Sequence, residues 1–179
     1  MIREELRPRQ RSDGQGATIT VTIVPTRARP RDVIAPLKVK VPIRLRKPHP
    51  IIKGWLDRHE EVRREYLDEW RPWMRRKTKP QMTDLDKRRL RILDGLFKAL
   101  ETTGGAVGDD GESFSLNGRR IRFRLYETSR VIGGGAYENT GLLKMVMMDL
   151  RLAWAESPRR PMENLLPVIA GTIVKAAST

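Results

Sequence analysis

Residues Ser113 to Tyr126 read Ser-Phe-Ser-Leu-Asn-Gly-Arg-Arg-Ile-Arg-Phe-Arg-Leu-Tyr, and this stretch decides the expected fold. Asn117-Gly118 is a strong signal for a β-hairpin, because a type I′ turn requires positive φ at both central residues. With these two residues in the turn, Ser115 faces Arg120 on the opposite strand. The strand alternation then gives the hairpin two chemically different faces.

One face of the predicted hairpin is apolar and the other is basic. The apolar face is built from Phe114, Leu116, Ile121, Phe123 and Leu125. The other face carries Ser113, Ser115, Arg120, Arg122, Arg124 and Tyr126. We expect the apolar face to form part of the core and the arginine face to be a candidate binding surface.

A capped amphipathic helix is predicted before the hairpin, over residues 84–103. Thr83 stands at the N-cap position with acidic residues in the first turn, and Gly104-Gly105 ends the helix. Its apolar face consists of Leu85, Ile92, Leu93, Leu96, Phe97 and Leu100. This face is expected to pack against the apolar side of the hairpin.

Further elements follow from the apolar periodicity and from the positions of the prolines. The sequence predicts helices over about 51–70 and 162–177, and strands over about 112–116, 119–126 and 142–150. The last of these strands is a short apolar run, whose pattern does not exclude a helix. We therefore expect an α+β fold: a small antiparallel sheet with a central Asn-Gly hairpin, packed on two or three helices, plus a basic extended N-terminal arm.

The N-terminal part is expected to be extended. Residues 1–16 are interpreted as a disordered basic arm, residues 17–46 as extended strands or arm, and residues 47–179 as the α+β domain. Leu37 to Arg46 alternates apolar with charged residues, and Pro42 within it indicates an edge strand or an extended segment lying on a surface. A charge-protected edge strand is favoured over a second basic ribbon for binding.

Composition excludes several classes of chemistry. The chain of 179 residues has no cysteine, so disulfides, thiolate metal sites and thiol catalysis are excluded. No apolar run approaches the roughly 20 residues that a membrane-spanning helix needs, and the first residues lack the apolar segment of a signal peptide. We expect a cytoplasmic protein without a membrane partner and without a cofactor.

Charge is the strongest compositional signal, with a formal net charge of +14. Residues 1–53 contain 13 Lys/Arg and 4 Asp/Glu, so the excess is concentrated in the N-terminal third. Such an excess favours binding to phosphate backbones or to acidic protein surfaces. Nucleic acid, either DNA or RNA, is the partner that we predict, and a protein partner is the alternative.

Three surfaces are candidates for contact with nucleic acid. The first is the hairpin face, with Arg120, Arg122 and Arg124. The second is a cationic and aromatic patch that comprises Arg71, Trp73, Arg75, Arg76, Lys77 and Lys79. The alternative for this patch is that its tryptophans anchor a loop to the core. The third is the alternating segment, with Lys38, Lys40, Arg44 and Arg46.

Enzymatic function is a less favoured hypothesis. From Thr83 onward the predicted order is helix, three strands and helix, which is shared by double-stranded RNA-binding domains and by metal-dependent nuclease cores. The lysine cluster that usually starts the last helix of the first class is missing. The residues that could serve a Mg²⁺-dependent nuclease are Glu101, Asp109, Asp110, Glu127 and Lys144. We predict a non-enzymatic nucleic-acid-binding protein, with a structural or adaptor subunit as the alternative.

Several segments also resemble those of an uncharacterised bacterial protein family. The resemblance spans about residues 37–177 and is carried by Lys47 to Glu60, Asp86 to Glu101, Gly118 to Glu127, Thr140 to Leu142 and Met162 to Ala170. Longer members of that family carry a helix-turn-helix-like segment before this region, which is absent here. The resemblance implies a bacterial intracellular protein and supplies no catalytic residues.

Overall fold

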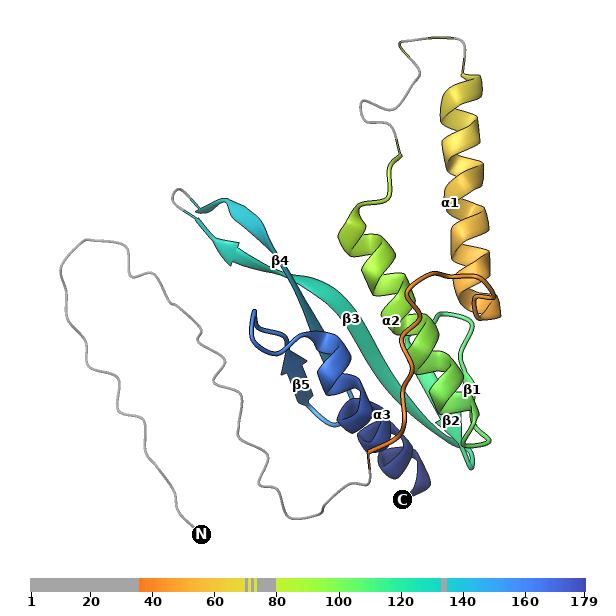
Figure 1. Ribbon diagram of the computed structural model, residues 1–179, viewed down its shortest axis with the longest axis vertical. Helices are drawn as coiled ribbons and strands as arrows, with labels where there is room; N and C mark the ends of the chain where they lie inside the picture. Colours follow the sequence, from red (N-terminus) through yellow and green to blue (C-terminus); the bar gives the residue numbers. More distant parts are fainter. Residues whose placement is uncertain (1–35, 70, 72, 74–79, 133–134) are drawn as a thin grey trace, which may run out of the picture.

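The computed structural model describes residues 36–69, 71, 73, 80–132 and 135–179 (Figure 1). Within them the fold is α+β, as predicted, with a five-stranded antiparallel open sheet and three helices. The helices are α1 (Pro50–Asp68), α2 (Asp84–Glu101) and α3 (Met162–Ser178). The strands are β1 (Ala106–Val107), β2 (Ser113–Leu116), β3 (Arg119–Val131), β4 (Tyr137–Met147) and β5 (Leu152–Ala155).

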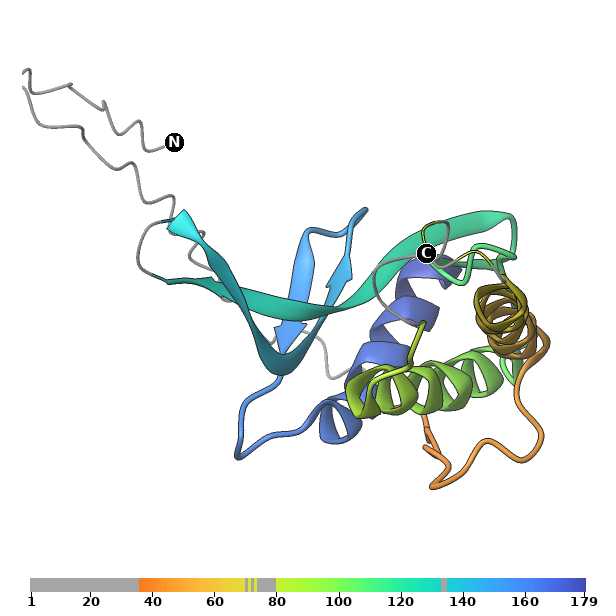
Figure 2. The ribbon, with the colours of Figure 1, turned by 90° about the horizontal axis from the view of Figure 1, so that it is seen from above.

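The sheet is a meander in which every strand pairs with its neighbour in sequence. Its order is β1-β2-β3-β4-β5, and Ser115 lies opposite Arg120 where β2 pairs with β3. Asn117 and Gly118 connect these strands with φ angles of 51° and 79°, the backbone conformation that a type I′ turn needs. Figure 2 shows α2 and α3 against one face of the sheet, with α1 beside α2.

The core lies between that face and the two helices. Aromatic rings connect its layers, because Phe97 of α2 contacts Phe123 of β3 at a centroid distance of 6.3 Å and Trp55 of α1 at 6.4 Å. Six residues of the predicted apolar faces are completely buried: Ile92, Leu96, Phe97, Leu100, Phe114 and Phe123. The side chains of α2 and of the hairpin therefore form one core, as their patterns indicate.

Local sequence explains where α2 begins. The hydroxyl of Thr83 accepts a hydrogen bond from the amide of Asp86 at 3.1 Å, and the carboxylate of Asp86 accepts one from the amide of Thr83 at 3.0 Å. This reciprocal capping box satisfies two of the free amides of the first turn. The helix ends at Glu101, two residues earlier than predicted, since the amides of Thr103 and Gly104 bond to carbonyl oxygens three residues back, at 3.1 and 3.0 Å.

A buried carboxylate joins α2, β4 and α3. Glu156 accepts hydrogen bonds from the guanidinium of Arg88 at 3.0 and 2.8 Å, and from the amides of Leu143 and Met162 at 2.7 and 3.0 Å. Glu163 also binds Arg88, at 2.9 and 2.7 Å. We call the set of Arg88, Glu156 and Glu163 the carboxylate clasp.

The predicted strand over 142–150 is wrong at both ends. β4 begins at Tyr137, and residues 148–151 form the turn to β5, in which Arg151 has a positive φ of 53°. β3 likewise continues to Val131 instead of ending at Tyr126. These extensions contain no buried residue, so their sequences lack the apolar alternation from which a half-buried strand is predicted.

The structure also shows two strands that the sequence analysis does not predict. β1 has two residues and β5 has four, which is too short for a periodic pattern. The order from Thr83 onward is therefore helix, five strands and helix. The comparison with three-stranded RNA-binding and nuclease domains rested on the wrong strand count.

Residues 37–46 are extended but form no edge strand. They cross α2, as the orange segment of Figure 1 shows, and their half-buried apolar residues Leu37, Val39, Val41 and Leu45 pack against the core. A helical surface offers no ladder of backbone partners, so no strand forms there. Pro42 is followed by a bend that leaves Ile43 86% exposed, against the predicted alternation. We call residues 36–48 the strap.

His49 connects the strap to α1. Its ring accepts a hydrogen bond from the amide of Ile51 at 3.3 Å and contacts Glu101 at 3.0 Å, while its amide donates to the buried Asp94 at 2.6 Å. His49 thereby caps α1 and is fixed in the core. Residues 1–35, with the predicted disordered arm over 1–16 and the first part of the extended segment predicted over 17–46, lie outside the described residues.

In the described part of the chain, none of the helices is both long enough and apolar enough to cross a membrane.

Candidate nucleic-acid interface

Each arginine of the hairpin face lies beside a carboxylate. Arg120 binds Asp110 at 2.8 Å, and Arg124 lies 3.3 Å from Glu112. Arg122 binds Asp149 through Nη2 at 2.8 Å and through its backbone amide at 2.7 Å. The face is not covered by a helix in Figure 2, but its positive charge is compensated by acidic side chains.

The contacts of this face lower the pKa values of two of its carboxylates, Asp149 and Asp110. The hydrogen bond from the side chain of Arg122 lowers the pKa of Asp149, and the pKa of Asp110 is lowered by the amide of Glu112, with contributions from Ser113 and Arg120. Both carboxylates therefore stay ionised in mildly acidic solution. A phosphate that approaches this face meets three arginines and three carboxylates, which weakens the attraction.

The second predicted patch is described only in part. Trp73 is 76% exposed, and Arg71 donates hydrogen bonds to the Glu69 carboxylate at 3.0 and 3.1 Å. The exposure of Trp73 disagrees with the alternative that this tryptophan anchors a loop to the core. The other predicted residues of the patch lie outside the described residues: Arg75, Arg76, Lys77 and Lys79.

The strap and the first turn of α1 carry cations that have no acidic partner among the described residues. Residues 33–56 contain no Asp or Glu, and their six cations are all exposed. In the part of the chain that the structure describes, none of their side chains forms an ion pair or a hydrogen bond. The six cations are Lys38, Lys40, Arg44, Arg46, Lys47 and Lys53. Four of them were predicted as binding residues, and here they differ from the hairpin arginines in having no compensating carboxylate.

Three hydrogen bonds hold the strap on the body of the protein. The amide of Leu37 donates to the carbonyl oxygen of Pro167 in α3 at 3.0 Å. From α2, Arg91 donates to the carbonyl oxygen of Ile43 at 2.8 Å, and Lys98 to that of Lys47 at 2.6 Å. The backbone that carries the strap cations is thus fixed to α2 and α3.

A close approach of backbones makes this anchoring testable. A Cβ at Gly95 of α2 would lie 2.7 Å from the carbonyl oxygen of Lys40, whereas a Cβ at Gly54 of α1 would have no atom within 4 Å. We expect Gly54→Ala to raise the free energy of unfolding by about 0.5–1 kcal/mol, because alanine favours helix. Gly95→Ala should instead show no gain or a loss, as measured by chemical denaturation.

Limited proteolysis of the same two variants separates the strap from the rest of the fold. In Gly95→Ala the strap should be cleaved faster than in the unsubstituted protein, because the added methyl group displaces it from α2. Cleavage in Gly54→Ala should be unchanged. A stabilised Gly95→Ala variant with a protected strap would contradict the observed packing.

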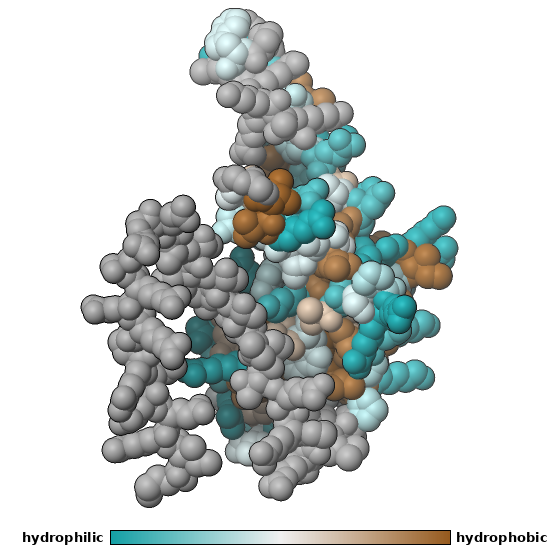
Figure 3. Space-filling view, turned by 90° about the vertical axis from the view of Figure 1, so that its left-hand side faces the viewer, coloured by the Kyte–Doolittle hydropathy of each residue, from teal (hydrophilic) through white to brown (hydrophobic). Residues whose placement is uncertain are grey.

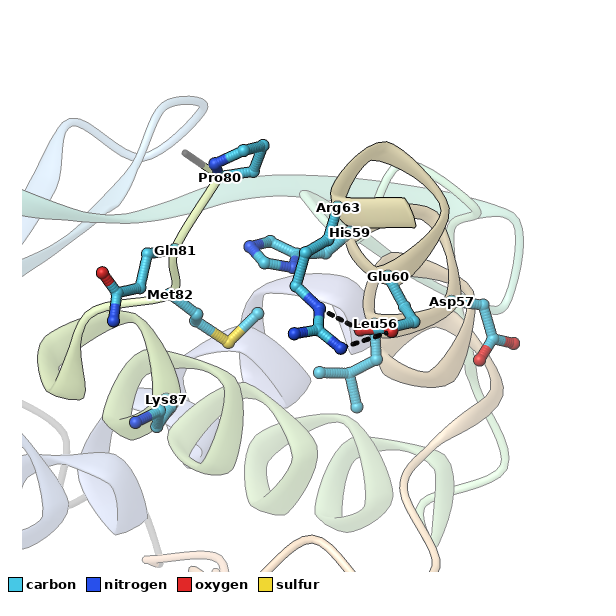
Figure 4. Close-up of a pocket in the computed structure, with 9 residues that line it drawn as sticks. All are labelled: Leu56, Asp57, His59, Glu60, Arg63, Pro80, Gln81, Met82 and Lys87. Carbon is cyan, nitrogen blue, oxygen red and sulfur yellow. Dashed lines mark hydrogen bonds and ion pairs between the residues drawn. The ribbon is translucent and has the colours of Figure 1, made fainter. Parts of the chain in front are cut away.

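A crevice between α1 and the segment before α2 is drawn in Figure 4. Leu56 and Met82 lie against the core there, and Arg63 binds Glu60 on α1 at 2.9 and 2.8 Å. The side-chain hydrogen bond from Arg63 lowers the pKa of Glu60, whose side chain is half exposed. These contacts join residues of one helix turn, and we assign no chemistry to the crevice.

The carboxylates considered for a nuclease do not converge. Glu101 binds His49, Asp110 binds Arg120, and Glu127 accepts a hydrogen bond from the amide of Gly141 at 2.8 Å. Among the described residues there is no group of three or more side chains that could hold a metal ion. The geometry thus brings together none of the sets that the enzymatic hypothesis requires.

Two cations of the strap region, Lys47 and Lys53, are absent from the predicted site. Their signal is present in the sequence as the acid-free window between Asp32 and Asp57. Arg91 was also not assigned a role, and no local pattern shows that it holds the carbonyl of Ile43, 48 residues away.

Comparisons with protein-family models, with curated proteins and with solved structures found no match.

Proposed function

We propose that the protein binds nucleic acid through the sugar–phosphate backbone, with the strap as its main contact. The observation that supports this proposal is a set of six exposed cations in a segment without acidic residues. None of the six forms an ion pair with a described residue. Unpaired lysines and arginines release counterions from phosphates without first giving up a protein partner. The bacterial cytoplasmic setting that the resemblance implies is compatible with such a role.

The form of the strap supports backbone contact over base reading. Lys38 and Lys40 are exposed while Leu37 and Val39 are half-buried, so the charges project from one side of an extended chain. Residues two apart in extended chain are separated by about 6.6 Å. A row of charges contacts successive phosphates but presents no planar donor and acceptor pattern to a base edge. Weak sequence preference is therefore part of the proposal.

The hairpin arginines are a secondary surface in this proposal. Each would have to exchange its carboxylate for a phosphate or bind both. Exchange between two anionic partners yields less net free energy than a new contact by an unpaired cation. Substitution of the strap should consequently weaken binding more than substitution of the hairpin face.

Fluorescence anisotropy with labelled duplex and single-stranded DNA and RNA, over a series of salt concentrations, tests the proposal. We expect binding that is micromolar or tighter at low salt and falls steeply as salt is added. Changing Lys38, Lys40, Arg44 and Arg46 to glutamine should lower the slope of log K against log salt by about 3–4 for a duplex. The matched control changes four exposed cations elsewhere to glutamine: Arg58, Arg64, Arg151 and Arg159.

The two variants have the same net charge, so a difference between them reports the location of the charges. A control slope that stays near that of the unsubstituted protein supports the strap as the contact. Equal losses in both variants would show nonspecific attraction by net charge alone. Absence of binding at low salt, or co-purification with an acidic protein instead of nucleic acid, would contradict the proposed function.

A further inference from the structure

Strands β3 and β4 continue beyond the body as a two-stranded ribbon, visible at the upper left of Figure 1. β2 pairs with β3 only from Arg119 to Arg122, and β5 pairs with β4 only from Lys144 to Met147. Residues 128–141, which we call the arm, thus have no third described strand on either edge. Open strand edges present unpaired backbone groups that can bind another strand.

The base of the arm is held by side-chain hydrogen bonds at a β-bulge. The register shifts between Glu127 and Ser129, and there the hydroxyl of Thr128 bonds to that of Thr140. Thr140 also donates to the carbonyl oxygen of Thr128 at 3.0 Å, and the amide of Gly141 donates to Glu127 at 2.8 Å. The direction of the arm is therefore fixed by the fold before any partner binds, which lowers the entropic cost of association.

Exposed apolar side chains gather near the end of the arm. Val131 and Tyr137 lie directly opposite each other and are 65% and 75% exposed, and the adjacent Ile132 is 42% exposed. Figure 3 is seen from the side to which the arm projects and shows hydrophobic surface among hydrophilic neighbours. Large apolar side chains placed together at an exposed site are typical of an interaction surface.

The charges of the arm favour a second copy of this chain over a polyanion. Residues 128–141 contain one cation and one acid, Arg130 and Glu138, which pair across the strands at 2.6 Å. The arm is therefore neutral in a chain of net charge +14. Two such arms related by a two-fold axis can place Arg130 of one against Glu138 of the other, so the surface is self-complementary.

We propose that the arm is a homodimer interface, in which the arms of two copies pair edge to edge and cover Val131, Ile132 and Tyr137. The strands would extend across the two-fold axis by backbone hydrogen bonds. The interface is independent of the strap and leaves its cations accessible. It also does not depend on the proposed binding of nucleic acid.

Sedimentation velocity of the full chain, treated with nuclease and freed of nucleic acid, tests this over a range of protein concentrations. We expect a monomer–dimer equilibrium. Changing both Val131 and Tyr137 to serine should raise the dimer dissociation constant by about tenfold or more, because the buried apolar area is lost. The matched control changes Met148 and Val168, which are 43% and 41% exposed, to serine and should dimerise like the unsubstituted chain.

A charge exchange tests the pairing itself. Arg130→Glu gives an arm with two acids and Glu138→Arg gives an arm with two cations, so each variant alone should dimerise more weakly. An equimolar mixture should form the heterodimer. Circular dichroism and thermal unfolding serve as folding controls, since all four substituted arm side chains are exposed.

Three results would overturn the proposal. They are a chain that remains monomeric at the highest concentration, a serine variant that dimerises as tightly as the unsubstituted protein, and charge variants whose mixture shows no restored association. The first excludes self-association, and the other two place it on a different surface.

Discussion

Changing Glu156 to alanine is expected to lower the free energy of unfolding by about 3–5 kcal/mol, measured by urea denaturation. The side chain of Glu156 is 2% exposed, and its carboxylate accepts four hydrogen bonds, two from Arg88 and one each from the amides of Leu143 and Met162. Alanine would leave both amides without an acceptor inside the protein. An unsatisfied buried donor costs about 1–3 kcal/mol.

Glu163→Ala is the matched control within the carboxylate clasp. The Glu163 side chain is 33% exposed, against 2% for Glu156, and it binds the same guanidinium. Water can replace it, so we expect a loss of about 1 kcal/mol or less. Equal effects of the two substitutions would contradict the assignment of Glu156 as the buried centre of the clasp.

Acid should weaken the clasp in a defined direction. Burial alone would raise the pKa of Glu156, but hydrogen bonds from Arg88, Leu143 and Met162 outweigh it, and the pKa lies below its ordinary value. A depressed pKa in the folded state gives stability that is present above the unfolded pKa of about 4.3 and is lost as pH falls through the folded pKa. The difference in stability between the unsubstituted protein and Glu156→Gln should therefore shrink below about pH 4. A difference that grows with acidification would contradict this.

Changing Gly105 to alanine is expected to cost about 2–3 kcal/mol, although alanine is a small residue. Its Cβ would overlap the ring of Phe114 and lie 2.6 Å from the carbonyl oxygen of Ser115. Phe114 is completely buried, and Ser115 is fixed by pairing with Ala106 of β1. Neither neighbour can move without opening the core, so the added methyl group overpacks it.

A double-variant cycle identifies the cause of that loss. Phe114→Leu shortens the side chain that the methyl group meets, so Gly105→Ala should cost less in its presence than in the unsubstituted protein. We expect a coupling of about 0.5–1.5 kcal/mol between the two sites, measured by denaturation of the four proteins. Additive effects would mean that the ring of Phe114 is not the obstacle.

Sequence patterns were sufficient where structure depends on neighbouring residues. Thr83 and the acids after it mark the start of α2, and the alternation around Asn117 and Gly118 matches the observed faces and register of β2 and β3. These features rest on hydrogen bonds and side-chain periodicities that span only a few residues. The three helices were located within a few residues for the same reason.

Patterns failed where the deciding partner is distant or where both sides of a strand are exposed. Arg122 reads as a free basic residue, but Asp149 pairs with it from 27 positions away. Residues 137–141 of β4 have no buried side, so no alternation marks them as a strand. The strap has the alternation of an edge strand, yet α2 and α3 occupy the place where a neighbouring strand would lie.

The carboxylate clasp has a consequence for synthesis of the chain. Arg88 precedes its partners Glu156 and Glu163 by 68 and 75 residues. At translation rates of about 5–20 residues per second, Arg88 waits roughly 4–15 s for the more distant of them. The strap needs Pro167, which is made later still. The strap is thus synthesised early but docks on the body late. Its cations are exposed to the cell interior before the rest of the domain is complete.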